Sequence, residues 1–177
     1  MQYRQQILPL GLIIVSFMLS ALLQNHGFIK YLSYALTLSG LALYIKNFLS
    51  YRYRNRILSP QSEVIYSPIS GSCKGEKVQG GVRRLWIKKH WLDPVEIRYP
   101  GSGCRWEDQN LILEKHGISF SFTASRFIKI DGAEPEPGAV LALMIGSGEC
   151  HISAPESYVF NLHKGDNLDA GETALIQ

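Results

Sequence analysis

The short stretch Ile145-Gly146-Ser147-Gly148 offers the most distinctive chemistry in this sequence. It follows an apolar run and precedes a closing segment, 164–173, that contains two glycines and two aspartates. A serine hydroxyl is a weak nucleophile at neutral pH, so it needs a general base, and an oxyanion formed by its attack needs hydrogen-bond donors. The titratable side chains nearby in the sequence are His90, Asp93, Glu96 and His151.

Composition excludes several other kinds of site. The 177-residue chain has a net charge of only +3, so its charge does not suggest a nucleic-acid partner. Its three cysteines, Cys73, Cys104 and Cys150, are widely spaced and odd in number. That pattern argues against a disulfide framework and against a zinc site, so we expect buried or inert thiols and no metal.

Residues 63–177 must form the element that positions the serine. Short β-rich runs alternate there with glycine- and proline-containing turns, and no stretch has a helical period over three turns. Regularly spaced short strands of this kind predict an all-β sandwich or barrel. The expected strands cover 63–66, 82–91, 110–114, 118–123, 127–130, 140–145, 158–162 and 173–176.

The N-terminal part, 1–50, predicts a transmembrane helical hairpin. Residues 7–23 and 31–45 contain no charge, and each becomes long enough to span when extended to about 7–25 and about 28–48. Backbone polar groups in lipid must be satisfied internally, so both spans are expected to be helices. The small residues available for close packing are Gly11, Ser16 and Ser20 on the first helix and Ser33, Thr37 and Gly40 on the second.

Charge around the spans predicts their orientation. Basic residues follow the second span and precede the first, so the positive-inside rule places both termini in the cytoplasm. Residues 51–62 form a basic linker in which Arg52, Arg54 and Arg56 either touch anionic head groups or serve as a plain topology signal. The second segment is the weaker span, and its failure to insert would move the soluble domain across the membrane.

Four local matches make the chain similar to the short, membrane-anchored phosphatidylserine decarboxylases, over most of its length. Residues 64–71 resemble the family's Val-Val-Ser-Pro-Ala-Asp-Gly, and residues 92–100 resemble Leu-Asp-Val-His-Val-Asn-Arg-x-Pro. Gly146-Ser147 stands at the family's processing bond. The tail, from Gly165-Asp166 through Ala170-Gly171-Glu172-Thr173, is the most specific match.

The resemblance implies a self-derived pyruvoyl cofactor. The Ser147 hydroxyl would attack the Gly146 carbonyl, and the resulting ester would eliminate and hydrolyse to leave a pyruvoyl group on the new N-terminus. Such a group accepts the electrons released by loss of carbon dioxide. The implied activity is conversion of phosphatidylserine to phosphatidylethanolamine at a phospholipid membrane.

Two catalytic positions of the family are replaced in this chain. Ser70 stands where the family has Asp and cannot supply a carboxylate, and Val95 stands where the family has His and cannot move a proton. Gly148 stands where Arg or Thr usually follows the serine. His90, Asp93, Glu96 and His151 are the candidates to take over the lost roles. The leading expectation is a divergent, membrane-bound member with impaired or absent self-processing.

Two other functions stay open at this point. The first is a pseudoenzyme that keeps the fold as a lipid- or partner-binding module, with Trp86, Trp91, Trp106 and Phe120 as candidates to line an apolar cleft. The second is a membrane-tethered adaptor like the biotinyl and lipoyl domains, whose swapped hairpins carry similar glycine pairs. A carrier needs a lysine at a hairpin tip, and Lys88-Lys89 lies between Trp86 and Trp91 instead.

Overall fold

The computed structural model describes residues 2–22, 27–51, 64–101, 103–107, 110–113, 116–130 and 138–176. The chain divides into two compact units, Met1–Tyr53 and Arg54–Gln177. The first is helical and the described part of the second is built from strands, as the sequence predicts. Arg52, Arg54 and Arg56 lie outside the described residues.

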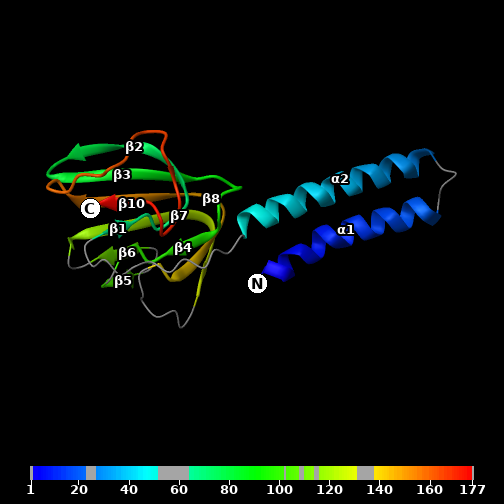
Figure 1. Ribbon diagram of the computed structural model, residues 1–177, viewed down its shortest axis with the longest axis horizontal. Helices are drawn as coiled ribbons and strands as arrows, with labels where there is room; N and C mark the ends of the chain where they lie inside the picture. Colours follow the sequence, from blue (N-terminus) through cyan, green and yellow to red (C-terminus); the bar gives the residue numbers. More distant parts are fainter. Residues whose placement is uncertain are drawn as a thin grey trace. The chain divides into compact units, whose positions relative to one another are not determined.

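The helical unit is an antiparallel pair, α1 (Gln2–Leu22) and α2 (Gly27–Ser50) (Figure 1). The pair is held by small polar side chains: Ser16 Oγ donates to the Ser33 carbonyl at 2.7 Å and lies 2.6 Å from Thr37 Oγ1. Gly40 permits the close approach, because a Cβ there would lie 2.8 Å from Ile13 Cγ1 and 3.0 Å from the Pro9 carbonyl. These contacts confirm the predicted packing at Ser16, Ser33, Thr37 and Gly40. The prediction was wrong for Gly11, where an added Cβ would meet nothing within 4 Å, and for Ser20, which is exposed.

Only α2, among the described helices, is long and apolar enough by length and composition to cross a membrane. The apolar part of α1, Gln6–Leu22, is shorter. Large apolar side chains such as Phe17, Leu22 and Phe28 are exposed on this unit, as expected where lipid rather than protein covers a helix. The sequence indicated the second segment as the weaker span, but it is α2 that meets the length and hydropathy criterion for crossing a membrane.

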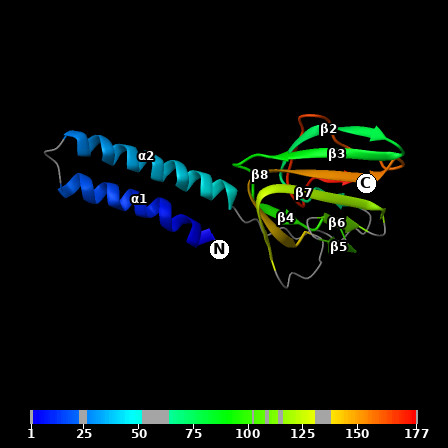
Figure 2. The ribbon, with the colours of Figure 1, turned by 180° about the vertical axis from the view of Figure 1, so that it is seen from behind.

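The second unit is a mostly antiparallel β half-barrel (Figures 1 and 2). An eight-stranded sheet has the order β5-β6-β7-β8-β3-β2-β9, with β4 also paired to β8, and β1 pairs with β10 in a separate two-stranded sheet. The strands are β1 (Ile65–Tyr66), β2 (Gly71–Gln79), β3 (Val82–Lys89), β4 (Glu96–Arg98), β5 (Cys104–Glu107), β6 (Asn110–Leu113), β7 (Ile118–Lys129), β8 (Val140–Pro155), β9 (Asn167–Leu168) and β10 (Ala174–Ile176).

The inner face of the curved sheet carries the core. Alternating residues of neighbouring strands are fully buried there, among them Leu85 and Ile87 on β3, Phe120 on β7 and Ile152 on β8. This alternation is what a sheet with one covered face requires. The all-β prediction is thus confirmed for the described part of residues 64–176.

Several predicted strand boundaries were wrong. The runs 118–123 and 127–130 belong to one strand, β7, and the run 140–145 continues through Gly146-Ser147 to Pro155 as β8. Residues 158–162 are not a strand. The strands are longer than expected because bulges let a ladder continue past residues that would otherwise end it.

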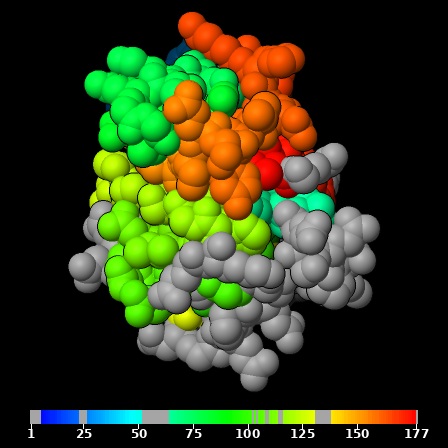
Figure 3. All heavy atoms as spheres, turned by 90° about the vertical axis from the view of Figure 1, so that its left-hand side faces the viewer, coloured from blue at the N-terminus to red at the C-terminus, as the bar shows by residue number. Residues whose placement is uncertain are grey.

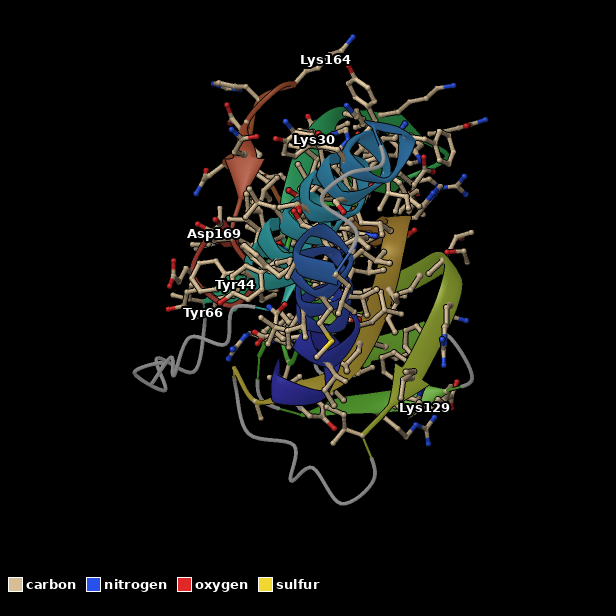
Figure 4. The ribbon with its side chains drawn as sticks, turned by 90° about the vertical axis from the view of Figure 1, so that its right-hand side faces the viewer. Lys30, Tyr44, Tyr66, Lys129, Lys164 and Asp169 are labelled. Atoms are coloured by element: carbon tan, nitrogen blue, oxygen red, sulfur yellow. The ribbon has the colours of Figure 1, made fainter. Side chains whose placement is uncertain are left out.

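The closing segment folds back onto the start of the domain. Ser67 donates its N–H to the Thr173 carbonyl at 2.8 Å, and Gly171 donates to the Ser67 carbonyl at 2.8 Å. Figure 4 shows Tyr66 and Asp169 on the same side of the domain, with Lys129 far from both. Backbone hydrogen bonds therefore connect the beginning and the end of the β-domain.

Candidate functional site

Gly146 and Ser147 lie at a bulge in β8. The ladder with β7 pairs Ile145 with Arg126 and Gly148 with Ala124, so two residues of β8 face the single residue Ser125. Gly146 has φ of 85°, a conformation in which glycine is favoured. A bulge leaves part of the ladder unpaired and re-aims side chains, and Ser147 is exposed here.

The other edge of β8 changes partner at the same place. Pairing with β3 ends where Lys89 meets Gly148, and pairing with β4 begins where Glu96 meets Leu143. Met144 donates its N–H to the Val95 carbonyl at 2.7 Å. The connecting segment, residues 90–95, therefore runs beside the Gly146-Ser147 bulge.

Lys89 places a charged group at the bulge. Its side chain is fully buried, and its Nζ donates to the Gly146 carbonyl at 2.7 Å and to the His90 carbonyl at 3.2 Å. Burial lowers the pKa of Lys89 from 10.5 to about 8, an effect that the nearby Asp93 carboxylate partly opposes. A buried amine is thus held at the carbonyl group that a serine attack would need.

Lys89 was missed as a site residue by sequence reasoning, which considered it only as a carrier lysine. The signal was present in the alternation of β3: Leu85, Ile87 and Lys89 are buried, whereas Arg84 and Lys88 are exposed. A lysine in phase with core residues must either be paired inside the domain or carry a function.

Ser70 and Val95, the two replaced positions, have structural surroundings. Ser70 is buried, and its Oγ accepts a hydrogen bond from the Ala170 N–H at 3.0 Å, which ties the closing segment to the start of β2. Val95 is buried, and its carbonyl accepts a hydrogen bond from the N–H of Met144. Met144 precedes Gly146 by two residues in β8. The structure therefore brings position 95 to the bulge, with a side chain that cannot carry a proton.

His90 and Asp93 shape the turn beside the bulge. The His90 N–H donates to Asp93 Oδ2 at 2.6 Å, and the Asp93 N–H donates to the His90 carbonyl at 3.1 Å. The His90 ring is exposed, with Nε2 at 3.4 Å from Ser72 Oγ. Asp93 therefore caps the turn and acts on Lys89 through its charge.

Glu96 and His151 have other partners. Glu96 is buried in an ion pair with Arg98, whose guanidinium also donates to the Gly138 carbonyl at 2.7 Å. His151 lies on the outer face of the sheet, 3.3 Å from the Glu149 carboxylate and edge-on to Trp86. Glu96 is thus paired within β4, and His151 contacts Glu149 on its own strand and Trp86 on β3; neither side chain contacts Ser147 in the described interactions.

Gly148 is fixed by packing. A Cβ at this position would lie 2.5 Å from Met144 Sδ and 2.7 Å from the Thr123 carbonyl. The position at which the resembling family carries Arg or Thr therefore has no room for a side chain here.

The aromatic residues do not line one common cleft. Phe120 is buried in the core, whereas Trp86 stands on the opposite face of the sheet beside His151. Trp106 stacks between Phe122 and Phe127, at centroid distances of 5.7 and 5.3 Å, and Trp91 is exposed on the turn after β3. Trp86 on β3 and Phe120 on β7 point to opposite faces of the sheet, whereas Trp106 lies on β5 and Trp91 on the turn after β3, so the four positions are separated.

In the described part of the chain, neither the cysteines nor other side chains that commonly bind metals form a reactive centre. Cys73 and Cys150 are buried, and burial raises the pKa of each thiol. No group of three or more His, Cys, Asp or Glu side chains that could hold a metal ion occurs in the described part of the chain.

Comparison of the chain with protein-family models, with curated proteins and with solved structures gave no significant match.

Proposed function

We propose that this chain is a membrane-tethered protein of the phosphatidylserine decarboxylase type, in which Gly146-Ser147 is a self-processing bond. The observation that carries the proposal is the 2.7 Å hydrogen bond from Lys89 Nζ to the Gly146 carbonyl oxygen, at a bulge whose serine is exposed. Lys89 supplies the donor that the family reaction needs and that the sequence motifs alone did not provide.

The processing step is an acyl shift from nitrogen to oxygen. Ser147 Oγ forms a bond to the Gly146 carbonyl carbon, and the Gly146-Ser147 C–N bond breaks. The proton leaving the hydroxyl ends on the Ser147 nitrogen, so an ester replaces the amide without any other reactant. Lys89 in its ammonium form stabilises the negative charge that develops on the Gly146 oxygen in the transition state.

The bulge also suits the precursor of a pyruvoyl group. Gly146 has no side chain to obstruct attack on its carbonyl, and its positive φ takes the peptide out of the regular ladder. Once formed from Ser147, a pyruvoyl group supplies an electron sink for decarboxylation of an amino-acid head group. Lys89 and the turn 90–93 are the residues that border it.

The membrane is the source of the substrate in this proposal. Helix α2 is apolar enough to span a bilayer, and α1 with α2 would form the expected hairpin. The basic residues flanking the pair in the sequence favour a β-domain on the cytoplasmic side. The substrate is a phospholipid with an amine and a carboxylate, as in phosphatidylserine.

A second candidate, a pseudoenzyme that binds lipid or a partner, is favoured by the surroundings of Ser70 and Val95. Ser70 is committed to the Ala170 N–H, and Val95 is an apolar side chain beside the bulge. Without a proton carrier there, processing is expected to be slow or absent. The hypothesis of a membrane-tethered adaptor with a carrier lysine has weaker support. The buried Lys89 amine cannot carry a cofactor, and Lys88 lies within β3 rather than at a hairpin tip.

Intact mass of the full-length protein purified from membranes tests the proposal. We expect two chains, 1–146 and 147–177, with the second blocked at its N-terminus. Ser147→Ala should abolish cleavage, and Lys89→Met should slow it about 100-fold or more, since one oxyanion donor is worth about 10²–10³ in rate. Lys88→Met, a change at the exposed neighbour, is the matched control and should cleave at the normal rate.

A single species near 19.9 kDa, stable over long incubation, would support the pseudoenzyme instead. Cleavage that persists in Ser147→Ala would show that the processing bond lies elsewhere. Processing that is equally fast in Lys89→Met would remove Lys89 from the mechanism.

A further inference from the structure

The turn after β3 displays two apolar side chains side by side. Trp91 is 54% exposed and Leu92 is 40% exposed. The other exposed large apolar residues of the described β-domain, Val78, Ile130 and Val159, stand singly. Trp91 and Leu92 are therefore the one consecutive exposed apolar pair in the described part of this domain.

The turn holds this pair in place. The two hydrogen bonds between His90 and Asp93 close it, and the Lys89 amine donates to the His90 carbonyl beneath it. On the far side Pro94 and Val95 are buried, and the Val95 carbonyl accepts from Met144. Because both ends are anchored in the domain, exposure of Trp91 and Leu92 is a property of the fold.

We propose that Trp91 and Leu92 insert into the interfacial layer of a phospholipid bilayer. Trp is enriched at the level of the head groups, where its ring is apolar and its N–H is polar, and Leu is suited to the acyl region just below. The same chain carries α2, which is apolar enough to span a membrane. A tether keeps the local concentration of lipid high, so two side chains are sufficient for contact.

The size of the pair favours lipid over a protein partner. A specific protein interface buries about 800 Å² on each side, which corresponds to about 20 residues or more. Two exposed apolar residues on a single short turn fall far below that area. A fluid bilayer needs no matching shape, so a small apolar tip is enough to engage it.

Charge around the tip predicts that insertion does not depend on anionic lipid. Lys88 is exposed, but it stands directly opposite Glu149 on β8, and Asp93 follows Leu92. The tip therefore has no excess of positive charge to attract anionic head groups. The contact is expected to be equal in neutral and in anionic membranes.

Insertion would direct the Gly146-Ser147 bulge toward the lipid surface, since Lys89 links the turn to the Gly146 carbonyl. This consequence rests on the proposed function, whereas the insertion itself does not. Measurement in the Ser147→Ala variant separates the two, because insertion must persist there whether or not the wild-type chain is processed.

Quenching of tryptophan emission by brominated phosphatidylcholine tests the insertion. The full-length chain is placed singly in lipid nanodiscs whose acyl chains carry bromine near the head group or near the chain end. The Trp91→Phe variant keeps only Trp86 and Trp106, so its emission comes from these two residues. The difference in emission between the wild type and this variant is the contribution of Trp91, called here the Trp91 share. A ring lying about 5–10 Å into the head-group boundary should lose roughly half of that share to the shallow bromines and less to the deep ones.

Val159→Trp in the Trp91→Phe background is the matched control. Val159 is 62% exposed and follows Pro155, which pairs with Val82 at the opposite end of β3. The Val82 end of β3 lies about 20 Å from Lys89 along the strand. At this end the β2–β3 turn contacts the segment that follows β8 (Figure 3). We expect no bromine quenching of the indole introduced at position 159, and unchanged quenching of Trp91 when phosphatidylglycerol is added. Quenching of Trp91 no greater than at position 159 would overturn the proposal.

Discussion

At the scale of single residues, Lys89 has the environment that most needs a reason. Its side chain is fully buried, and its amine donates hydrogen bonds to the backbone carbonyls of Gly146 and His90. Burial of an amine disfavours the charged form, which is why the pKa of Lys89 falls to about 8. Near neutral pH the group remains mostly protonated but close to its titration, which suits a donor that responds to charge on the Gly146 oxygen.

The lowered pKa of Lys89 predicts a pH dependence of stability. The folded state releases the proton near pH 8, whereas the unfolded state holds it up to about 10.5. The unfolded state thus holds this proton between these values, so the contribution of Lys89 to the free energy of unfolding rises with pH across this window and is flat below it. The gain is of the order of a few kcal/mol, at about 1.4 kcal/mol for each pH unit.

Comparison with Lys89→Met isolates this effect. The free energy of unfolding of both full-length proteins is measured by chemical denaturation in detergent from pH 7 to above pH 10. We expect the difference, wild type minus variant, to increase with pH above about 8. Parallel curves for the two proteins would show that the Lys89 amine titrates normally in the folded state.

At the scale of elements, the bulge in β8 explains how one long strand serves three partners. It lets β8 pair with β7 along its length while the opposite edge passes from β3 to β4. Gly146 provides the positive φ, and Gly148 provides the close approach to Met144 Sδ and to the Thr123 carbonyl. These two glycines have different roles, one in conformation and one in packing.

Gly148→Ala is therefore expected to destabilise the β-domain. The new methyl would meet a backbone carbonyl that cannot turn away, and overpacking of this kind costs about 1–3 kcal/mol. Gly101→Ala is the matched control, because its nearest atoms are 3.9 Å away, and it should be nearly neutral. Thermal unfolding of the full-length protein, followed by far-UV circular dichroism in the β region, measures both. Equal midpoints for the two variants would contradict the packing account.

At the scale of the whole molecule, the two units have different kinds of interior. The helical unit is joined by the Ser16, Ser33 and Thr37 hydrogen bonds and by the contact at Gly40. The β-domain has a conventional apolar core, with Leu85, Ile97 and Phe120 fully buried. Polar contacts between helices suit a lipid surrounding, where hydrophobic burial between helices gives no advantage.

Because each unit has its own interior, we expect two separate unfolding transitions. Ser16→Ala should lower only the helical transition, by about 0.6–2 kcal/mol for the lost interhelical hydrogen bonds. Gly148→Ala should lower only the β transition. Ser20→Ala is the control, since Ser20 lies on the same helix but is exposed. Calorimetry of the full chain in detergent distinguishes the two transitions, and a single transition moved by both changes would contradict their independence.

The sequence by itself determined the division of the chain and the type of each part. Long uncharged runs predict helices, and short alternating runs between turn residues predict strands, because these patterns depend only on local periodicity. The close packing at Ser16 and Gly40 was equally predictable from residue size. The Gly146-Ser147 stretch could be singled out for the same reason, since its signal lies within neighbouring residues.

Only the tertiary structure decided what surrounds that stretch. Lys89 is 57 positions from Gly146 in the sequence, and the pairing of β3 with β8 brings its amine to the Gly146 carbonyl. The same pairing directs His151 to the outer face and places the Trp91-Leu92 turn beside the bulge. Strand register is set by contacts between distant segments and by bulges, so a shift of one residue would have exchanged the buried and exposed side chains without changing any local pattern.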